Sequence, residues 1–382
     1  MQALERIISR FNFNELIHQK RLLSNFFLAC LIFALLNCIL FFLDERYMVS
    51  AIMKNACYFD LPGLSKICSR GNKGNGSQMI LLGSSLLIYP IWELERKLGA
   101  ECADPNHYHL TSYLDEKLKA HNSSIKSACN LGSGGAMISD CYLLLSRYTK
   151  QAANGADWVV VNCAPRDFCD SGMNSPNLTP IFDYLYNDAD SLESGKEYLP
   201  SIESYLKFFA EHHCYLYKNR KWLNETLVGQ ICHNLISPHN NTEHSASVPT
   251  LQIDDKMLSS LQEYKGRYFA ISLKAIEPQL HFLQLIIDFC KEKKFRLVLV
   301  NMPLTAQNRS LLDSRFYNGY VSCMKNMANC KDQEICFLDL GSDKKYLLSD
   351  FNDSVHLNAT GAIKFEDQIV DFISNAKQSR TH

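Results

Sequence analysis

The sequence predicts an α/β fold in which a parallel sheet is covered by helices on both faces. Two observations indicate this class. Short apolar runs of strand length alternate along the chain with longer amphipathic runs of helix length. Glycine or proline turns directly follow three of the apolar runs. Such turns are expected where the strands of a parallel sheet reach its carboxyl edge, which is where functional sites gather.

The first strand, turn and helix predict the centre of this arrangement. Residues 79–82 are apolar and predict a buried strand, which stops at Gly83, Ser84 and Ser85, while residues 88–98 are amphipathic and predict a helix. A serine at such a turn lies near the N–H groups of the helix. This position suits a nucleophile whose reaction creates an oxyanion. A serine here can also do no more than cap the helix.

The remaining elements follow in the same alternation. Apolar runs predict strands at residues 125–131, 157–163, 296–301 and 336–340. Amphipathic runs predict helices at residues 136–153, 275–294, 315–328 and 362–374. Residues 170–265 lose the alternation, are rich in Tyr, Phe and His, and contain a helical piece at residues 205–222. They predict a helical insertion or lid near the carboxyl end of the sheet.

Residues 22–43 contain no charged side chain and predict a transmembrane helix, since about 20 apolar residues are enough to cross the hydrocarbon core. Four cations precede this segment, at Arg6, Arg10, Lys20 and Arg21. The nearest cations after it are only Arg46 and Lys54. The positive-inside rule therefore predicts a single-pass protein of the cytoplasmic membrane, with its N-terminus inside and its globular domain outside.

The chain is predicted to consist of a cytoplasmic segment (residues 1–21), the anchor (22–43), a linker (44–77), the globular domain with its insertion (78–375) and a tail (376–382). A net charge of −1 gives no basic field that would indicate a nucleic-acid partner. No metal site and no cofactor are predicted, because His107, His109 and His121 lack metal-ligand spacing and are expected at the surface. The 15 cysteines show no CxxC spacing, so buried free thiols are expected, although Cys57 and Cys68 flank a loop that a disulfide could close.

A second candidate motif lies near the C-terminus, just before the last predicted helix. Asp353 and His356 stand three residues apart in a loop, where their side chains can meet. The carboxylate can then orient the imidazole, and the other ring nitrogen can accept a serine proton. A surface histidine with no role in catalysis would show the same short pattern.

The order of these motifs resembles that of the SGNH, or GDSL-like, hydrolase superfamily. Residues 83–86, Gly-Ser-Ser-Leu, are similar to its Gly-Asp-Ser-Leu block, with Ser85 at the nucleophile and Ser84 in place of the aspartate. Residues 130–135 resemble the glycine block that lends an N–H group to the oxyanion hole, with Gly135 as the best match.

The third and fourth blocks complete the resemblance. Residues 164–167, Ala-Pro-Arg-Asp, stand where the family has Gly-x-Asn-Asp, so Arg166 replaces the asparagine that donates to the oxyanion. Asp353 and His356 match the catalytic acid and base. The resemblance implies an SGNH-hydrolase-like, flavodoxin-like three-layer fold and a Ser-His-Asp mechanism.

Membrane-anchored relatives, such as proteins of alginate O-acetylation, resemble this layout. They imply a serine esterase or O-acyltransferase that acts on acyl esters of extracytoplasmic envelope glycans. The expected partners are an acylated glycan or other ester substrate, the lipid bilayer through residues 22–43, and, for a transferase, a multi-spanning protein that supplies the acyl group. The alternative is a non-catalytic binding or assembly protein of the envelope with the same fold.

Overall fold

The computed structural model describes residues 25–39, 77–101, 104–105, 108–121, 124–151, 157–170, 179, 201–214, 253–328 and 335–378. The chain separates into two compact units, which are described one at a time. The larger unit spans residues 57–198 and 247–382 and carries the sheet and the candidate site. The smaller unit spans residues 1–56 and 199–246.

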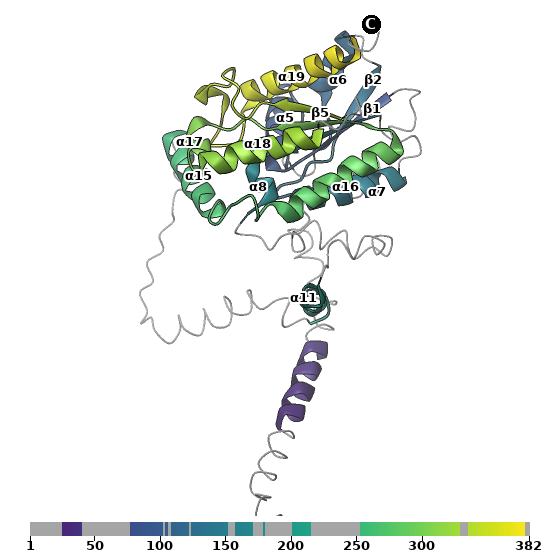
Figure 1. Cartoon of the computed structure of the whole chain (residues 1–382), viewed down its shortest axis with the longest axis vertical. Coiled ribbons are helices and arrows are strands. Elements are labelled where there is room, and N and C mark those ends of the chain that lie inside the picture. Colours follow the sequence, from purple (N-terminus) through teal and green to yellow (C-terminus); the bar gives the residue numbers. More distant parts are fainter. Residues whose placement is uncertain are drawn as a thin grey trace, which may run out of the picture. The chain divides into compact units, whose positions relative to one another are not determined.

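The larger unit is an α/β domain built on one parallel sheet of five strands (Figure 1). The strands are β1 (Ser77–Leu82), β2 (Ile125–Asn130), β3 (Trp158–Cys163), β4 (Arg296–Asn301) and β5 (Ile335–Asp339). Their spatial order is β2-β1-β3-β4-β5, which is the order of flavodoxin-like sheets. The predicted parallel sheet is confirmed, and each predicted strand lies within two residues of an observed one. The order reverses between β1 and β3, so the end of β1 lies at the switch point where such sheets bind ligands.

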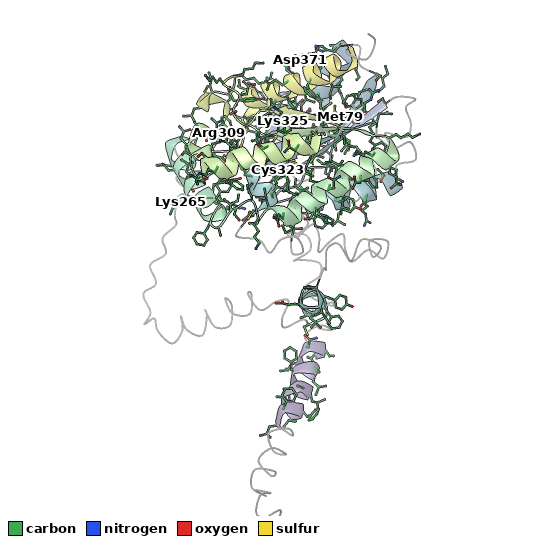
Figure 2. All side chains as sticks on the ribbon, viewed as in Figure 1. Met79, Lys265, Arg309, Cys323, Lys325 and Asp371 are labelled. Carbon is green, nitrogen blue, oxygen red and sulfur yellow. The ribbon has the colours of Figure 1, made fainter. Side chains whose placement is uncertain are left out.

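The central strands are nearly continuous apolar runs because both of their faces are covered. All six residues of β3 are buried, as are the last five of β1 and of β4. Met79 of β1, which is labelled in Figure 2, is fully buried. The edge strand β5 is only partly buried.

Helices lie on both faces of the sheet, as predicted. Along the chain they are α5 (Ser85–Lys97), α6 (Ser112–Ala120), α7 (Ile138–Gln151), α8 (Pro165–Phe168), α15 (Ile253–Arg267), α16 (Glu277–Lys293), α17 (Ala306–Arg309), α18 (Ser314–Ala328) and α19 (Ala359–Gln378). Helices α5, α6 and α19 pack together, and α7 packs on α16 across the sheet from them (Figure 1). This division follows from right-handed crossovers, since β1 to β2 runs in the opposite direction from the later connections.

One helix was not predicted, and two predicted boundaries are corrected. Helix α6 lies within residues 100–126, a mixed and polar stretch, with only Leu114 and Leu118 buried as its apolar face. Helix α19 runs to Gln378, into the predicted tail at residues 376–382, because no glycine or proline stops it. The expected linker at residues 44–77 ends one residue earlier, since Ser77 begins β1; the rest of it lies outside the described residues.

The predicted insertion at residues 170–265 is divided between the two units. Helix α15 belongs to the larger unit, whereas α11 (Ile202–His213) belongs to the smaller one. Helix α11 accounts for the first part of the helical piece predicted at residues 205–222, and residues 215–222 lie outside the described ones.

The smaller unit also contains a helix at residues 25–39. Its large apolar side chains are exposed, among them Phe26, Phe27, Leu31 and Leu35. None of the helices that the structure describes is both long enough and apolar enough to span a membrane. The predicted anchor at residues 22–43 extends past the described helix at both ends, so it stays a prediction.

Candidate active site

The turn between β1 and α5 presents Ser85 at the carboxyl end of the sheet. Ser84 is the N-cap of α5 and is buried, while Ser85 is the first helical residue and is half-buried beside a cleft. The turn is tight because Gly83 has no side chain: a Cβ atom there would lie 3.1 Å from the Cβ atom of Asn162 on β3. The strand and helix predicted around this serine therefore place its hydroxyl at the open edge of the sheet.

The loop before α19 brings Asp353 and His356 to the same place. His356 Nδ1 lies 2.7 Å from Asp353 Oδ2, and His356 Nε2 lies 3.0 Å from Ser85 Oγ. Both distances are within hydrogen-bond range. The structure thus joins the three predicted residues in one hydrogen-bonded chain, although Ser85 and His356 are 271 positions apart in the sequence. Such a chain is the arrangement in which a histidine can take a proton from a serine.

The charge on Asp353 is favoured by its neighbours. Its Oδ1 atom accepts the backbone N–H groups of Val355 and His356, both at 2.8 Å. Burial alone would raise the pKa of Asp353, but the hydrogen bond and charge of His356 and these two N–H groups outweigh it and hold the pKa below its usual value. Asp353 is therefore an ionised carboxylate that orients the imidazole at neutral pH.

The loop itself is fastened by Ser354, which is fully buried. The Ser354 hydroxyl lies 2.6 Å from the Ser260 hydroxyl of α15 and accepts a hydrogen bond from Asn308 Nδ2 at 3.1 Å. The Thr305 hydroxyl donates to the Ser354 carbonyl at 2.8 Å. Two segments that are remote in the sequence, α15 and the start of α17, therefore hold the loop that carries Asp353 and His356.

The second predicted turn lies beside Ser85. The Ser133 N–H donates to the Gly83 carbonyl at 3.0 Å, so the two turns are attached to each other. Gly135 has a φ of 79°, a left-handed conformation that glycine adopts without strain, and it lines the same cleft as Ser85. Within the described residues, no acceptor lies within reach of the backbone N–H groups of Ser85 and Gly135. Both N–H groups therefore remain available to an oxyanion.

The third predicted turn forms α8 and places Arg166 below the cleft. Its side chain is 3% exposed, so Arg166 is a buried ion-pair partner and not a surface one. It pairs with Asp167 and Asp170 and also donates to the carbonyls of Gly135 and Ala136, each at 3.2 Å. Burial raises the pKa of Asp167, and the charge of Arg166 opposes that rise. Four hydrogen bonds thus occupy a group that has five N–H donors, and direct donation to an oxyanion stays a prediction.

A cleft of about 640 Å³ opens over these groups. The cleft is lined by α5, with Tyr89 and Trp92, and by α15, with Ser260, Tyr264 and Arg267. The Tyr89 ring lies 5.1 Å from the His356 ring between centroids and is 36% exposed. An aromatic surface of this kind, beside a nucleophile, can contact the part of a substrate next to the scissile bond.

Sequence reasoning missed the contribution of α15, because this helix lies at the end of an irregular stretch and carries no motif. One expectation for the histidines is wrong: His109 is buried, and its Nδ1 atom lies 2.8 Å from the carbonyl of Asn130, so it supports the end of β2. Among the described residues, no group of three His, Cys, Asp or Glu side chains could hold a metal ion. The cysteines that the structure describes are free thiols, but only Cys129, Cys141, Cys163 and Cys290 are buried, so the expectation of buried thiols is met for these four alone.

No protein-family model and no curated protein matches the chain. Among solved structures, the chain is similar to a family two carbohydrate esterase from Clostridium thermocellum in complex with cellohexaose. The TM-score is 0.33 and the identity 10%, over 78% of this chain and 64% of that chain. The chain thus spans less than two thirds of that protein.

Proposed function

We propose that this protein is an SGNH-type serine esterase or O-acyltransferase. The observation that carries the proposal is the hydrogen-bonded chain from Ser85 Oγ through His356 to Asp353, at an open cleft and at the switch point of the sheet. The available N–H groups of Ser85 and Gly135 lie in the same cleft. A nucleophile, its base, an orienting carboxylate and two oxyanion donors are the parts that acyl transfer needs.

The first half of the reaction forms an acyl-enzyme. As Ser85 Oγ bonds to the ester carbonyl carbon, its proton passes to His356 Nε2, and the carbonyl oxygen becomes an oxyanion bound by the Ser85 and Gly135 N–H groups. When the tetrahedral intermediate collapses, the C–O bond to the alcohol breaks. His356 Nε2 returns its proton to the leaving alkoxide, and Asp353 stabilises the imidazolium in between.

The second half of the reaction releases the acyl group. An acceptor hydroxyl gives its proton to His356 Nε2 while its oxygen attacks the acyl carbon, and the bond to Ser85 Oγ then breaks as Ser85 regains that proton. Water as acceptor makes the protein an esterase, and a sugar hydroxyl makes it a transferase. For a transferase, we propose a multi-spanning membrane partner as the source of the acyl group.

An acylated glycan is the substrate that suits the cleft best. Tyr89 and Trp92 are one helical turn apart on α5, with ring centroids 6.2 Å apart, and both line the cleft beside the triad. Aromatic rings offer an apolar face with little loss of conformational entropy, which suits the apolar face of a sugar ring. Glu93, Lys256 and Asn352 line the same cleft and can bond to sugar hydroxyls.

The membrane location is part of this proposal. It rests on the uncharged run at residues 22–43 and on the cations that precede it. A periplasmic-type reporter such as alkaline phosphatase, fused after residue 60, is expected to be active, whereas a cytoplasmic reporter fused at the same residue is not. The reverse pattern would contradict the extracytoplasmic location and the envelope substrate with it.

A fluorophosphonate probe tests the function itself. The wild-type protein is expected to react covalently at Ser85, because the probe resembles the tetrahedral intermediate and reacts only with an activated serine. Ser85→Ala should remove the label, while Ser84→Ala, at the buried serine next to it, should keep the label. Mass spectrometry of the labelled peptide reads the position directly. A folded wild-type protein that binds acylated glycan but takes no label would instead favour the non-catalytic alternative.

A further inference from the structure

Arg166 acts on the loop of Gly135 through two carbonyl groups. Its Nη2 atom donates to the Gly135 carbonyl and its Nη1 atom to the Ala136 carbonyl, both at 3.2 Å. These carbonyls belong to the two peptide planes that directly follow the N–H group of Gly135. Because peptide planes are rigid, only the two backbone dihedrals of Gly135 separate the first of these planes from the plane that carries this N–H group, and the two dihedrals of Ala136 separate the second plane from the first. Arg166 therefore limits where the Gly135 N–H can point.

Arg166 is held in turn by Asp170, whose side chain is fully buried. Arg166 Nε donates to Asp170 Oδ2 at 3.2 Å, and Arg267 Nη1 of α15 donates to the same oxygen. Arg267 is braced by Glu263, which accepts from Nε at 2.9 Å and from Nη2 at 2.6 Å. Asp170 thus joins two guanidinium groups, one below the oxyanion loop and one on α15.

Helix α15 also contacts the loop that carries Asp353 and His356. Ser260, two helical turns before Arg267, bonds to Ser354 in the loop of Asp353 and His356. One helix therefore contacts the loop that carries the base directly, through Ser260 and Ser354, and is linked to the Gly135 loop indirectly, through Asp170 and Arg166. Neither contact requires α15 to touch the reacting atoms.

We propose that Asp170 is a positioning residue for the oxyanion hole, which it aligns through Arg166 while anchoring the loop to α15. This inference rests on the proposed function, and it assigns Arg166 a structural task in place of direct donation to the oxyanion. Loss of the Asp170 charge removes the ion pairs that hold Arg166 Nε and link Arg267 to it, and leaves at most a weaker, neutral hydrogen bond in their place. The Gly135 loop then samples other conformations, which a glycine in the left-handed region adopts easily.

The test is Asp170→Asn in the full chain, because asparagine keeps the shape and removes the charge. We expect kcat to fall about 10- to 100-fold, since misplacement of a catalytic group by about 1 Å typically has an effect of that size. KM should change less than threefold. A boronic acid that forms a tetrahedral adduct on Ser85 should bind more weakly by about the same factor as kcat falls, because it needs the aligned oxyanion hole.

Hydrogen exchange gives a readout that does not depend on activity. In Asp170→Asn, amides of residues 132–137 should exchange at least about tenfold faster than in the wild type, as expected for local opening of a loop. The control is Asp115→Asn on α6, where a half-buried carboxylate accepts the Ala128 N–H at 2.6 Å and does not line the cleft. It should leave kcat and the exchange of residues 132–137 unchanged.

Each outcome decides one question. The positioning role is wrong if folded Asp170→Asn has the same kcat, boronate affinity and amide exchange as the wild type. That result would leave the assignment of Ser85, His356 and Asp353 intact. If the wild-type protein shows no turnover that depends on Ser85, the proposed function is wrong. Hydrogen exchange of residues 132–137 then still decides whether Asp170 holds the Gly135 loop. Should Asp170→Asn not fold, Arg267→Gln makes the same test, because that side chain is 31% exposed and its loss frees Asp170 from α15.

Discussion

Ser85→Ala and His356→Ala are each expected to lower kcat by a factor on the order of 10⁶ for hydrolysis of a p-nitrophenyl ester, measured by release of p-nitrophenolate. Alanine at position 85 removes the atom that bonds to the acyl carbon. Alanine at position 356 removes the only described side chain within hydrogen-bond reach of Ser85 Oγ, at 3.0 Å, so the hydroxyl stays protonated and a poor nucleophile. The double variant should be no slower than either single one, because the two residues act as a unit.

The control for this prediction is His121→Ala. His121 is a partly exposed histidine at the C-terminal end of α6, with its Nδ1 atom 3.0 Å from the Lys117 carbonyl and its Nε2 atom 3.8 Å from Asp371 Oδ1. Its replacement should leave kcat within about twofold of wild type. Additive losses in the double variant, or wild-type turnover in Ser85→Ala, would show that the two residues do not form a catalytic unit.

Much of this site could be predicted from the sequence, because its parts lie next to strong local signals. The buried strand before Gly83 and the amphipathic helix after it fix the position of Ser85, and the short loop before α19 fixes Asp353 against His356. The spacing of apolar residues in strands and in helices is enough to predict where such a turn lies. The parallel sheet follows from the alternation of these elements, and β3 and β4 begin within one residue of the predicted positions.

The role of Arg166 could not be predicted in the same way. The motif placed Arg166 at the site but did not show that its donors turn toward the Gly135 and Ala136 carbonyls, because that depends on Asp170 and on Arg267. Asp170 and Arg267 are 97 positions apart and flank a stretch whose sequence lacks the strand–helix alternation. A pair of this kind leaves no periodic signal in a single sequence. Helix α6 was missed for a related reason, since two buried leucines one turn apart are too few to define a helical period.

Asp353→Asn is expected to lower kcat by about 10⁴-fold, which corresponds to roughly 5 kcal/mol of transition-state stabilisation. Asparagine can still accept the N–H groups of Val355 and His356, which now bond to Oδ1 at 2.8 Å, so the loop should keep its shape. The lost element is the negative charge 2.7 Å from His356 Nδ1, which fixes the tautomer and stabilises the imidazolium. KM should therefore change much less than kcat.

The same substitution changes the acid stability of the protein in a predictable direction. Neighbouring donors hold the pKa of Asp353 below its usual value, so its ionised form stabilises the folded state above the unfolded pKa, near 4. That contribution is lost as the pH falls through the lower, folded pKa, and Asp353→Asn should lack it. Asp343→Asn is the matched control: its carboxylate also accepts a backbone N–H, from Lys345 at 2.9 Å, and also has a lowered pKa, but it lies outside the cleft. Asp343→Asn should keep full turnover. If Asp353→Asn keeps it too, His356 needs no carboxylate to orient it, and the base works from the hydrogen bond to Ser85 alone.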